Sequence, residues 1–200
     1  VPIDDHVQTV YKDSLIFLVT GWSNSGNVAD VQIYNTYTDS WQAGTSTPNN
    51  NNYKCFGASG EIIGDTLYYF GGAAGLNFSA QTELRKGYIN PSDPSDISWS
   101  EVELSPVLTG YRSAVCLTDQ AIHWLGGSSV TYNFNAIAYN GSGLVAPSNH
   151  TVYYHPNGQW GSEAGVNIPM DLRGLANITD RRKQIVGGIG TNGVVQSAVV

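Results

Sequence analysis

Four short apolar stretches along the chain each end in glycine. They read LIFLVTG, TLYYFGG, AIHWLGG and KQIVGG, and their last glycines are Gly21, Gly72, Gly127 and Gly188. Fifteen residues before these glycines, a second run of alternating apolar and polar residues begins at His6, Gly57, Arg112 and Arg173. Alternation with a period of two is typical of half-buried β-strands. Repetition at intervals of 51, 55 and 61 residues predicts one supersecondary element present four times, with insertions in its loops.

A third and a fourth run follow the glycine in the first three units. The third contains a tyrosine and the fourth a tryptophan, in the pairs Tyr34 and Trp41, Tyr88 and Trp99, and Tyr154 and Trp160. Asn, Asp, Pro and Gly stand between the members of each pair, where a hairpin needs turn residues. We therefore expect four antiparallel strands in each unit, which is the sequence signature of a β-propeller blade.

Paired glycines after the second strand, with tyrosine in the third and tryptophan in the fourth, resemble the kelch repeat. The sharpest matches are Gly71-Gly72, Gly126-Gly127 and Gly187-Gly188, whereas the first unit has Thr20-Gly21. The resemblance covers nearly the whole chain. It implies one all-β, kelch-type β-propeller domain over residues 1–200, with blades at about 1–48, 49–106, 107–166 and 167–200. Glycine suits these places because inner strands crowd together there and only small residues allow close backbone approach.

The fourth unit is incomplete, because the sequence stops near the end of its third strand. Kelch propellers usually have six or seven blades, so the resemblance favours a portion of a larger propeller over an unusual four-bladed one. An unpaired edge is an aggregation liability. We therefore expect missing blades or another chain to pack against the open edge.

Composition narrows the classes of protein that the chain can represent. Charged residues make up 12 %, the net charge is −7 and the pI is about 4.8, which excludes a basic surface for nucleic acid. The longest aliphatic or aromatic run, Leu15 to Val19, is far below the ~20 residues of a membrane helix. The polar surface of low charge favours a secreted, periplasmic or cell-surface location.

Two cysteines, Cys55 and Cys116, have no metal-ligand spacing. The two cysteines stand at different positions along the first strands of neighbouring units. The difference corresponds to about 20 Å along the strand at ~3.3 Å per residue. A disulfide spans only ~5.5 Å between Cα atoms. We therefore expect two buried thiols and no bond between them.

The starts of the first strands carry the most suggestive polar residues. Equivalent positions near a propeller axis form a ring, so the ring should contain His6 beside Asp5, Arg112, and Arg173 beside Asp171. Two guanidiniums and an imidazole form a candidate site for a carboxylate or a sugar acid. In the alternative interpretation, these side chains bind loop backbones and hold the blades together.

The loops that follow the second strands should lie on the same face. They are rich in Asn, Ser, Gly and aromatic residues, which suit sugar hydroxyls and sugar faces, and the candidates are Tyr132, Asn133, Asn135, Phe78 and Phe134. We expect Arg85 and Lys86 to approach the same end of the propeller axis. The alternative is a set of solvated loops with a small core of their own.

Three functions remain open. The leading one is a secreted or cell-surface binding module for a glycan or a protein. Weak similarity around VYYHPNGQW, IPMDLRGLANI and VGGIG to kelch mutarotases that act on N-acetylneuraminate implies a sugar-active enzyme as the alternative. Arg112 and Arg173 would then hold the carboxylate, with Asp5, Asp171 and Glu83 as candidate bases. The third is a structural propeller within a larger surface assembly.

Metal and cofactor chemistry finds little support in the sequence. The four histidines follow no HxH or HExxH pattern, and no GxSxG elbow occurs. Galactose oxidase, which also has a kelch propeller, builds a copper site from Tyr, His and a Cys–Tyr crosslink. Tyr154-His155 is superficially similar to two of those ligands, but no partner set accompanies it. We therefore expect no metal and no cofactor.

Overall fold

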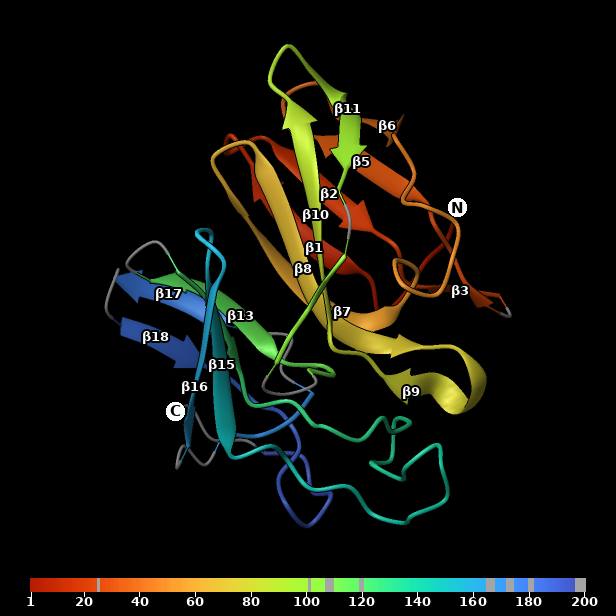
Figure 1. The fold of residues 1–200 in the computed structure, drawn as a ribbon, viewed down its shortest axis with the longest axis vertical. Coiled ribbons are helices and arrows are strands. Elements are labelled where there is room, and N and C mark those ends of the chain that lie inside the picture. Colours follow the sequence, from red (N-terminus) through yellow and green to blue (C-terminus); the bar gives the residue numbers. More distant parts are fainter. Residues whose placement is uncertain are drawn as a thin grey trace.

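A computed structural model of the chain describes residues 1–24, 26–100, 102–106, 110–118, 121–164, 168–171, 175–179 and 182–196. Within these ranges, the regular structure consists of β-strands and one 3₁₀ turn, η1 (Leu76–Phe78). The strands form a succession of antiparallel sheets (Figure 1), which confirms the all-β prediction.

The first three sheets share a core of four strands in sequence order, and the fourth has two described strands. Sheet 1 contains β1 (Val7–Tyr11), β2 (Leu15–Val19), β5 (Val31–Asn35) and β6 (Ser40–Gly44). Sheet 2 contains β7 (Phe56–Ile63), β8 (Thr66–Ala74), β10 (Glu83–Asn90) and β11 (Asp93–Trp99), with β9 (Ser79–Ala80) paired to β8 and β12 (Glu103–Leu104) to β10. Sheet 3 contains β13 (Ala114–Thr118), β14 (Ala121–Leu125), β15 (His150–His155) and β16 (Gln159–Ala164), and sheet 4 contains β17 (Leu175–Thr179) and β18 (Arg182–Ile185). A small hairpin, β3 (Trp22–Ser23) and β4 (Gly26–Asn27), lies between β2 and β5.

Local sequence accounts for these strands and turns. In β1 the residues alternate between buried and exposed, as the period of two predicts. The β15–β16 hairpin turns through Pro156, Asn157 and Gly158, and Gly158 adopts a φ of +92° that glycine accepts without strain. Gly64, with a φ of +59°, has the same role in the two-residue turn between β7 and β8.

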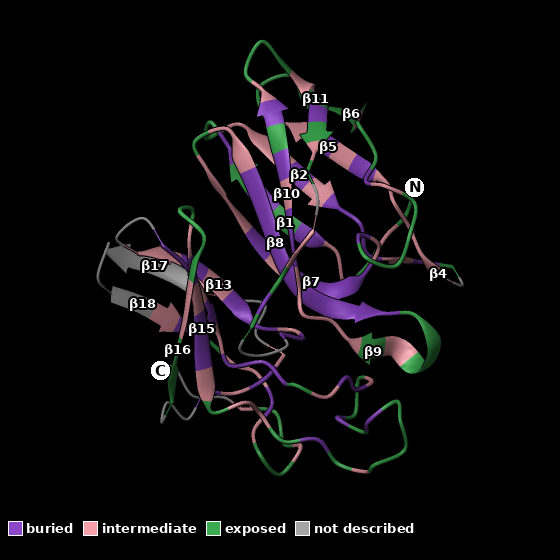
Figure 2. Ribbon diagram, viewed as in Figure 1, coloured by how far each residue is buried: buried purple, intermediate pink, exposed green. Residues whose placement is uncertain are grey.

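The sheets pack face to face, and their first strands gather on one side. Strand β1 lies beside β7, β7 beside β13, and β13 beside β17 (Figure 1). Buried residues dominate β8, whereas the fourth strand β6 is largely exposed (Figure 2). The largest buried cluster joins one face of sheet 1, including Phe17 and Ile33, to Leu67 and Tyr69 of sheet 2.

The four repeated glycines occupy equivalent places, as the repeat predicts. The residue after each glycine pairs with the start of its unit's first strand, in the bridges Asp4–Trp22, Phe56–Ala73, Tyr111–Ser128 and Met170–Ile189. Gly21 donates its backbone N–H to the Cys55 carbonyl at 2.9 Å, and Gly72 donates to the Gly110 carbonyl at 2.5 Å. Each of these two glycines therefore ties its sheet to the segment that leads into the next one.

The same bridges correct the constant spacing of fifteen residues. The residues that follow the bridged positions are Asp5, Gly57, Arg112 and Asp171. The equivalent positions are therefore Asp5 rather than His6 in unit one, and Asp171 rather than Arg173 in unit four. Counting back a fixed number missed the one or two extra residues that these units hold before their glycines.

Cys55 and Cys116 are buried free thiols, which confirms the expectation that they do not form a disulfide. Burial raises the pKa of the Cys55 thiol, although the nearby Arg85 guanidinium lowers it in part. Cys55 is therefore a packing residue at the junction of sheets 1 and 2.

Replacing Gly71 by alanine should destabilise the protein strongly. Its φ is +72°, and an added Cβ would collide with the Gly110 carbonyl oxygen, which is backbone and cannot rotate away. We expect a loss of ~3 kcal/mol or more in the free energy of unfolding, measured by urea denaturation. Gly64→Ala is the control, because the φ of Gly64 is also positive but no other atom lies within 4 Å of the added Cβ. This variant should lose about 1 kcal/mol in the free energy of unfolding. Equal losses in the two variants would contradict the close approach.

Candidate ligand-binding site

The four residues that open the first strands share an unusual backbone conformation. Asp5, Gly57, Arg112 and Asp171 have φ values of +47°, +69°, +52° and +56°. The Gly57 N–H donates to the Asp5 carbonyl at 2.8 Å, and the Arg112 N–H donates to the Gly57 carbonyl at 2.7 Å. Left-handed conformations at non-glycine residues cost free energy and cluster at functional sites. Through the two backbone hydrogen bonds, Asp5, Gly57 and Arg112 form a row across the first three sheets.

The Arg112 guanidinium lies at the centre of this row. Its side chain is 9 % exposed, and Nη2 donates to Asp5 Oδ2 at 2.5 Å, while Nη1 lies 3.7 Å from Asp171 Oδ2. The Tyr111 and Tyr132 rings lie 5.1 and 5.3 Å from its central carbon. Burial acts to lower the pKa of Arg112, but Tyr111 and the two carboxylates outweigh it, so the pKa is raised. The guanidinium therefore stays charged.

The hydrogen bonds of Arg112 leave part of its guanidinium without a partner in the described part of the chain. Its Nε is buried and has no hydrogen-bond partner there. A buried polar group without a partner carries a desolvation cost of about 1–3 kcal/mol.

A cavity of about 400 Å³ lies against the same residues. Residues from β1, β7, β13 and β17 line it, together with the row at their starts, and the lining comprises Asp5, His6, Gln8, Gly57, Ala58, Ser59, Arg112, Ser113, Ala114, Val115 and Leu175. A volume of this size lies within the range of small-molecule sites. Carboxylate, imidazole, amide, hydroxyl and guanidinium groups are all within its walls.

The structure brings part of the predicted site together. Asp5, His6 and Arg112 line the cavity, and Asp171 contacts Arg112. Arg173 lies outside the described residues. Gln8 and Ser59 were missed by the sequence reasoning, although each lies two positions beyond a named residue. The period of two in a strand therefore held the signal that would have found them.

The loop candidates do not reach this cavity. Tyr132 is fully buried, and its carbonyl accepts a hydrogen bond from the Tyr111 hydroxyl at 3.0 Å. Asn133 Oδ1 accepts from the backbone of Asn135, and Asn135 Oδ1 accepts from the backbone of Ile137, both at 3.1 Å. These amides shape their own loop, as Asx turns do.

The aromatic residues of the loops divide into two groups. Phe78 packs edge-on against Trp22 and Phe56 at 5.3 and 5.4 Å between ring centroids, and against Tyr139 at 4.9 Å. Phe134 is 87 % exposed. The loops therefore have a small core of their own, with Phe134 outside it.

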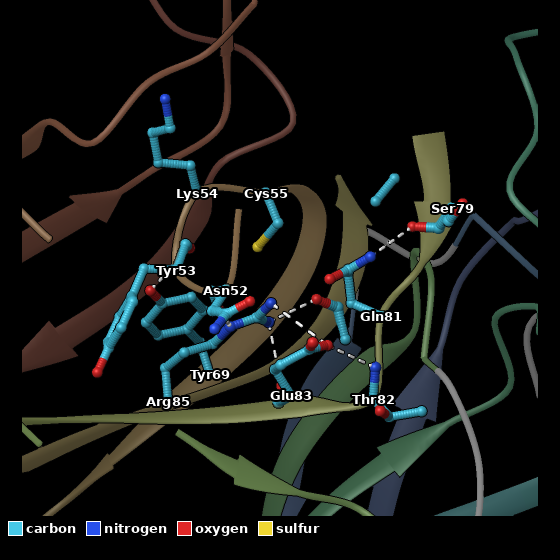
Figure 3. Close-up of polar contacts among 12 residues, drawn as sticks. Asn52, Tyr53, Lys54, Cys55, Tyr69, Ser79, Gln81, Thr82, Glu83 and Arg85 are labelled. Atoms are coloured by element: carbon cyan, nitrogen blue, oxygen red, sulfur yellow. Dashed lines mark hydrogen bonds and ion pairs between the residues drawn. The ribbon is translucent and has the colours of Figure 1, made fainter. Parts of the chain in front are cut away.

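Arg85 does not line the cavity either. Its side chain is fully buried in the structure, between β10 and the segment that precedes β7 (Figure 3). Nε donates to the Asn52 carbonyl at 2.6 Å, and Nη1 donates to the carbonyls of Gly71 at 2.6 Å and Glu83 at 3.0 Å. The guanidinium also lies 5.2 Å from the Tyr69 ring centroid. Arg85 therefore binds loop backbone. This is the role that the alternative interpretation gave to Arg112 and Arg173.

Lys86, the neighbour of Arg85, joins sheets 2 and 3. Its Nζ lies 2.6 Å from Glu103 Oε2 and donates to the Tyr154 hydroxyl at 2.8 Å. Trp160 Nε1 donates to Glu103 Oε1 at 2.8 Å. Burial acts to raise the pKa of Glu103, but the hydrogen bonds from Lys86, Trp160 and Tyr154 outweigh it and lower that pKa. The sequence reasoning gave Glu103 no role.

Comparison with protein-family models and with curated proteins finds no match for this sequence. The solved structure of YjhT is similar, with a TM-score of 0.66 at 17 % identity over 94 % of this chain. The match takes in 60 % of YjhT, so the chain spans less than two thirds of that protein. A likeness at this identity concerns the fold alone: an all-β arrangement of four-stranded antiparallel sheets.

Two further findings concern membrane-spanning helices and metal-binding groups. In the described ranges, no helix has the length and apolar character needed to cross a membrane. The same residues contain no group of three or more His, Cys, Asp or Glu side chains that could hold a metal ion.

The Glu103 contacts should make stability depend on pH. A carboxyl whose pKa is lowered by folding stabilises the native state above its unfolded pKa of ~4.3, and the stabilisation is lost as the pH falls through the folded value. Glu103→Gln should therefore lower the free energy of unfolding by about 1 kcal/mol at pH 7. The difference from wild type should shrink towards zero below about pH 4. Urea denaturation across pH measures it, with Glu163→Gln on the exposed part of β16 as the control. A difference that does not change with pH would refute this account.

Proposed function

We propose that the chain is a kelch-type β-propeller module that binds a small polar ligand of the carbohydrate class in the cavity between its first strands. The repeated glycine pairs, the recurring four-stranded sheets and the neighbouring first strands support the propeller arrangement. In this proposal the sheets are blades within residues 1–48, 49–106, 107–166 and 167–200. The similarity in fold to YjhT agrees with it.

The observation that carries the proposal is that the charged Arg112 guanidinium, whose buried Nε has no hydrogen-bond partner in the described residues, belongs to a residue that lines the cavity. Arg85, which binds loop backbone, also has a buried nitrogen without a hydrogen-bond partner, Nη2, but it does not line this cavity of about 400 Å³. Sugar hydroxyls both donate and accept hydrogen bonds. They can accept from the Arg112 guanidinium and donate to oxygen acceptors of the wall, such as the Ser59 hydroxyl.

The charge around Arg112 favours a neutral sugar over a sugar acid. Asp5 and Asp171 already lie within 2.5 and 3.7 Å of its terminal nitrogens. A ligand carboxylate would be repelled by these two carboxylates, whereas a neutral hydroxyl would not. A protein that binds glycans would meet them in a secreted, periplasmic or cell-surface location, which is part of the proposal.

A sugar-active enzyme is the second candidate, because Asp5 and His6 line the same cavity. A carboxyl and an imidazole can exchange protons with a sugar hydroxyl during ring opening. The rate of exchange between the anomers of N-acetylneuraminate, followed by ¹H NMR with and without the protein, tests this candidate. A rate unaffected by the protein leaves the binding module as the function.

Binding of sugars tests the leading proposal. Isothermal titration with a panel of neutral monosaccharides and N-acetylneuraminate should identify a ligand, and Arg112→Met should weaken its binding at least tenfold. A charge-assisted hydrogen bond is worth about 1.5–3 kcal/mol, which corresponds to that factor. The tightest ligand should be neutral.

Two further variants separate binding from folding. Ser59→Leu fills the cavity without touching the Arg112 ion pairs and should also abolish binding. Asn135→Ala, in the exposed loop outside the cavity, should leave the affinity unchanged. If Asn135→Ala loses binding while Ser59→Leu retains it, the ligand site is on the loops and the proposal is wrong.

A further inference from the structure

The sequence contains four Asn-x-Ser/Thr motifs, which begin at Asn77, Asn140, Asn149 and Asn177. This motif is the acceptor for N-linked glycans, which attach to the asparagine side chain on surface loops of secreted proteins. A chain this rich in asparagine, serine and threonine also forms such motifs by chance. The structure separates the two cases, because an attached glycan has to project into solvent and the whole motif has to be accessible.

Asn140 lies in a turn of the long segment between β14 and β15. Asn140, Gly141 and Ser142 are all exposed, so the complete motif is accessible. The backbone N–H of Ser142 donates to Asn140 Oδ1 at 2.9 Å and closes an Asx turn. The side-chain oxygen is thus in use, whereas Nδ2, the atom that receives a glycan, makes no hydrogen bond within the described ranges. The acceptor nitrogen is therefore not held by the fold.

Asn77 is the second accessible acceptor. It lies in η1, between β8 and β9, and has a left-handed φ of +60°, which asparagine tolerates better than most residues. Asn77 and Ser79 are exposed, whereas Phe78 between them is half-buried. Ser79 Oγ donates to the Leu76 carbonyl at 3.2 Å, and the Asn77 side chain makes no hydrogen bond to a described residue. The ring of Phe78 thus anchors the motif while its asparagine and serine stay at the surface.

The two accessible motifs belong to loops that pack against each other. Phe78, the middle residue of the first motif, lies 4.9 Å from Tyr139, measured between ring centroids, and Tyr139 directly precedes Asn140. Thr131 Oγ1 also donates to the Phe78 carbonyl at 2.5 Å. Figure 1 shows the segment between β14 and β15 running past β9. Asn77 and Asn140 therefore share one surface, which is built on the aromatic core of the loops.

The other two motifs are tied to strands. Asn149 is exposed, but the hydroxyl residue of its motif, Thr151, is buried in β15 between β14 and β16. Asn177 stands within β17, where it pairs with Lys183 of β18. Because the acceptor motif requires the asparagine and the hydroxyl residue together, these two motifs are not part of the inference.

We propose that Asn77 and Asn140 carry N-linked glycans, an inference that rests on the secreted or cell-surface location in the proposed function. In the reaction, the asparagine Nδ2 attacks the anomeric carbon of an oligosaccharide that is linked to a lipid through a diphosphate. The new bond joins this carbon to Nδ2, and the bond from the carbon to the diphosphate oxygen breaks. The amide loses one proton, and the lipid diphosphate is the leaving group.

The positions of the two asparagines determine what the glycans cover. Leu76 directly precedes Asn77 and is 91 % exposed, and Tyr139 directly precedes Asn140 and is 36 % exposed. Glycans on the two asparagines cover these apolar side chains. Neither Asn77 nor Asn140 lines the cavity of the first strands, so the ligand site stays open.

The test is the occupancy of each motif in secreted protein. The 200-residue chain is produced with a signal peptide in a eukaryotic host, and peptide N-glycosidase in H₂¹⁸O then converts each glycosylated asparagine into an ¹⁸O-labelled aspartate. Peptide mass spectrometry should find this label at Asn77 and Asn140 in most of the secreted protein. The isotope excludes spontaneous deamidation before the digestion, to which the exposed Asn140-Gly141 pair is prone. Absence of the label from both sites overturns the proposal.

Variants of the hydroxyl residues test whether the motifs direct the modification. Ser142→Ala should abolish the label at Asn140, whereas Ser142→Thr should retain it. Ser79→Ala should abolish the label at Asn77. Asn135→Gln, in the same exposed segment as Asn140 but outside any motif, should remove no glycan. Label that persists at Asn140 in Ser142→Ala would show that the motif does not direct the modification, and the proposal would be wrong.

Sugar titration separates the glycan sites from the ligand site. The affinity for the neutral monosaccharides of the panel should be the same before and after enzymatic removal of the glycans. A changed affinity would place the glycans at the cavity and contradict their proposed position. If none of the monosaccharides binds, the ligand site fails while the occupancy measurement still decides the glycan sites, so the two failures are distinguishable.

Discussion

The close approach of backbones at the second-strand glycines is the constraint on which the rest of the structure depends. Gly72 donates its N–H to the Gly110 carbonyl at 2.5 Å, and any side chain on Gly71 would collide with that same carbonyl. Because this contact holds one sheet against the segment that leads into the next sheet, the first strands gather on one side. The cavity exists because four first strands reach the same place.

Farther from the glycines, larger side chains fill the junctions between the sheets. Near the first strands the packing residues are small, such as Ala58 and Ala114, whereas Phe70, Trp124 and Trp160 fill the outer part of the junction between sheets 2 and 3. Aromatic rings contribute both buried area and defined edge or offset contacts. The polarity of this packing gives the two sides of each sheet different partners.

Three cations of the chain illustrate how burial decides the role of a charge. Arg85 is surrounded by backbone carbonyls and serves the loop before β7. Lys86 pairs with Glu103 across a sheet junction, where solvent still reaches part of the pair. Arg112 is paired with Asp5 and Asp171 and also lines a cavity. The same residue type is thus a structural element in one place and a candidate ligand contact in another.

The sequence by itself determined the class of structure and the order of its parts. Period-two alternation, turn residues and glycines in phase predicted four strands per unit, because these are local properties that the backbone expresses wherever the strand lies. It also brought out Asp5, His6 and Arg112 through their equivalent places in the repeat. Insertions before the glycines defeated a fixed count, so His6 and Arg173 were put where Asp5 and Asp171 belong.

Only the tertiary structure decided which polar groups meet. Arg85 and Arg112 look alike in sequence, yet one is directed into the junction of sheets 1 and 2 and the other towards the cavity, because side-chain partners come from segments tens of residues away. The exposure of Trp41 is equally invisible in the repeat pattern, since its equivalents Trp99 and Trp160 donate hydrogen bonds to Thr45 and Glu103, which follow the last strand of the preceding sheet. The strand pattern is a local property, whereas the burial of a side chain and the partner of a charged group depend on the residues of the neighbouring sheet.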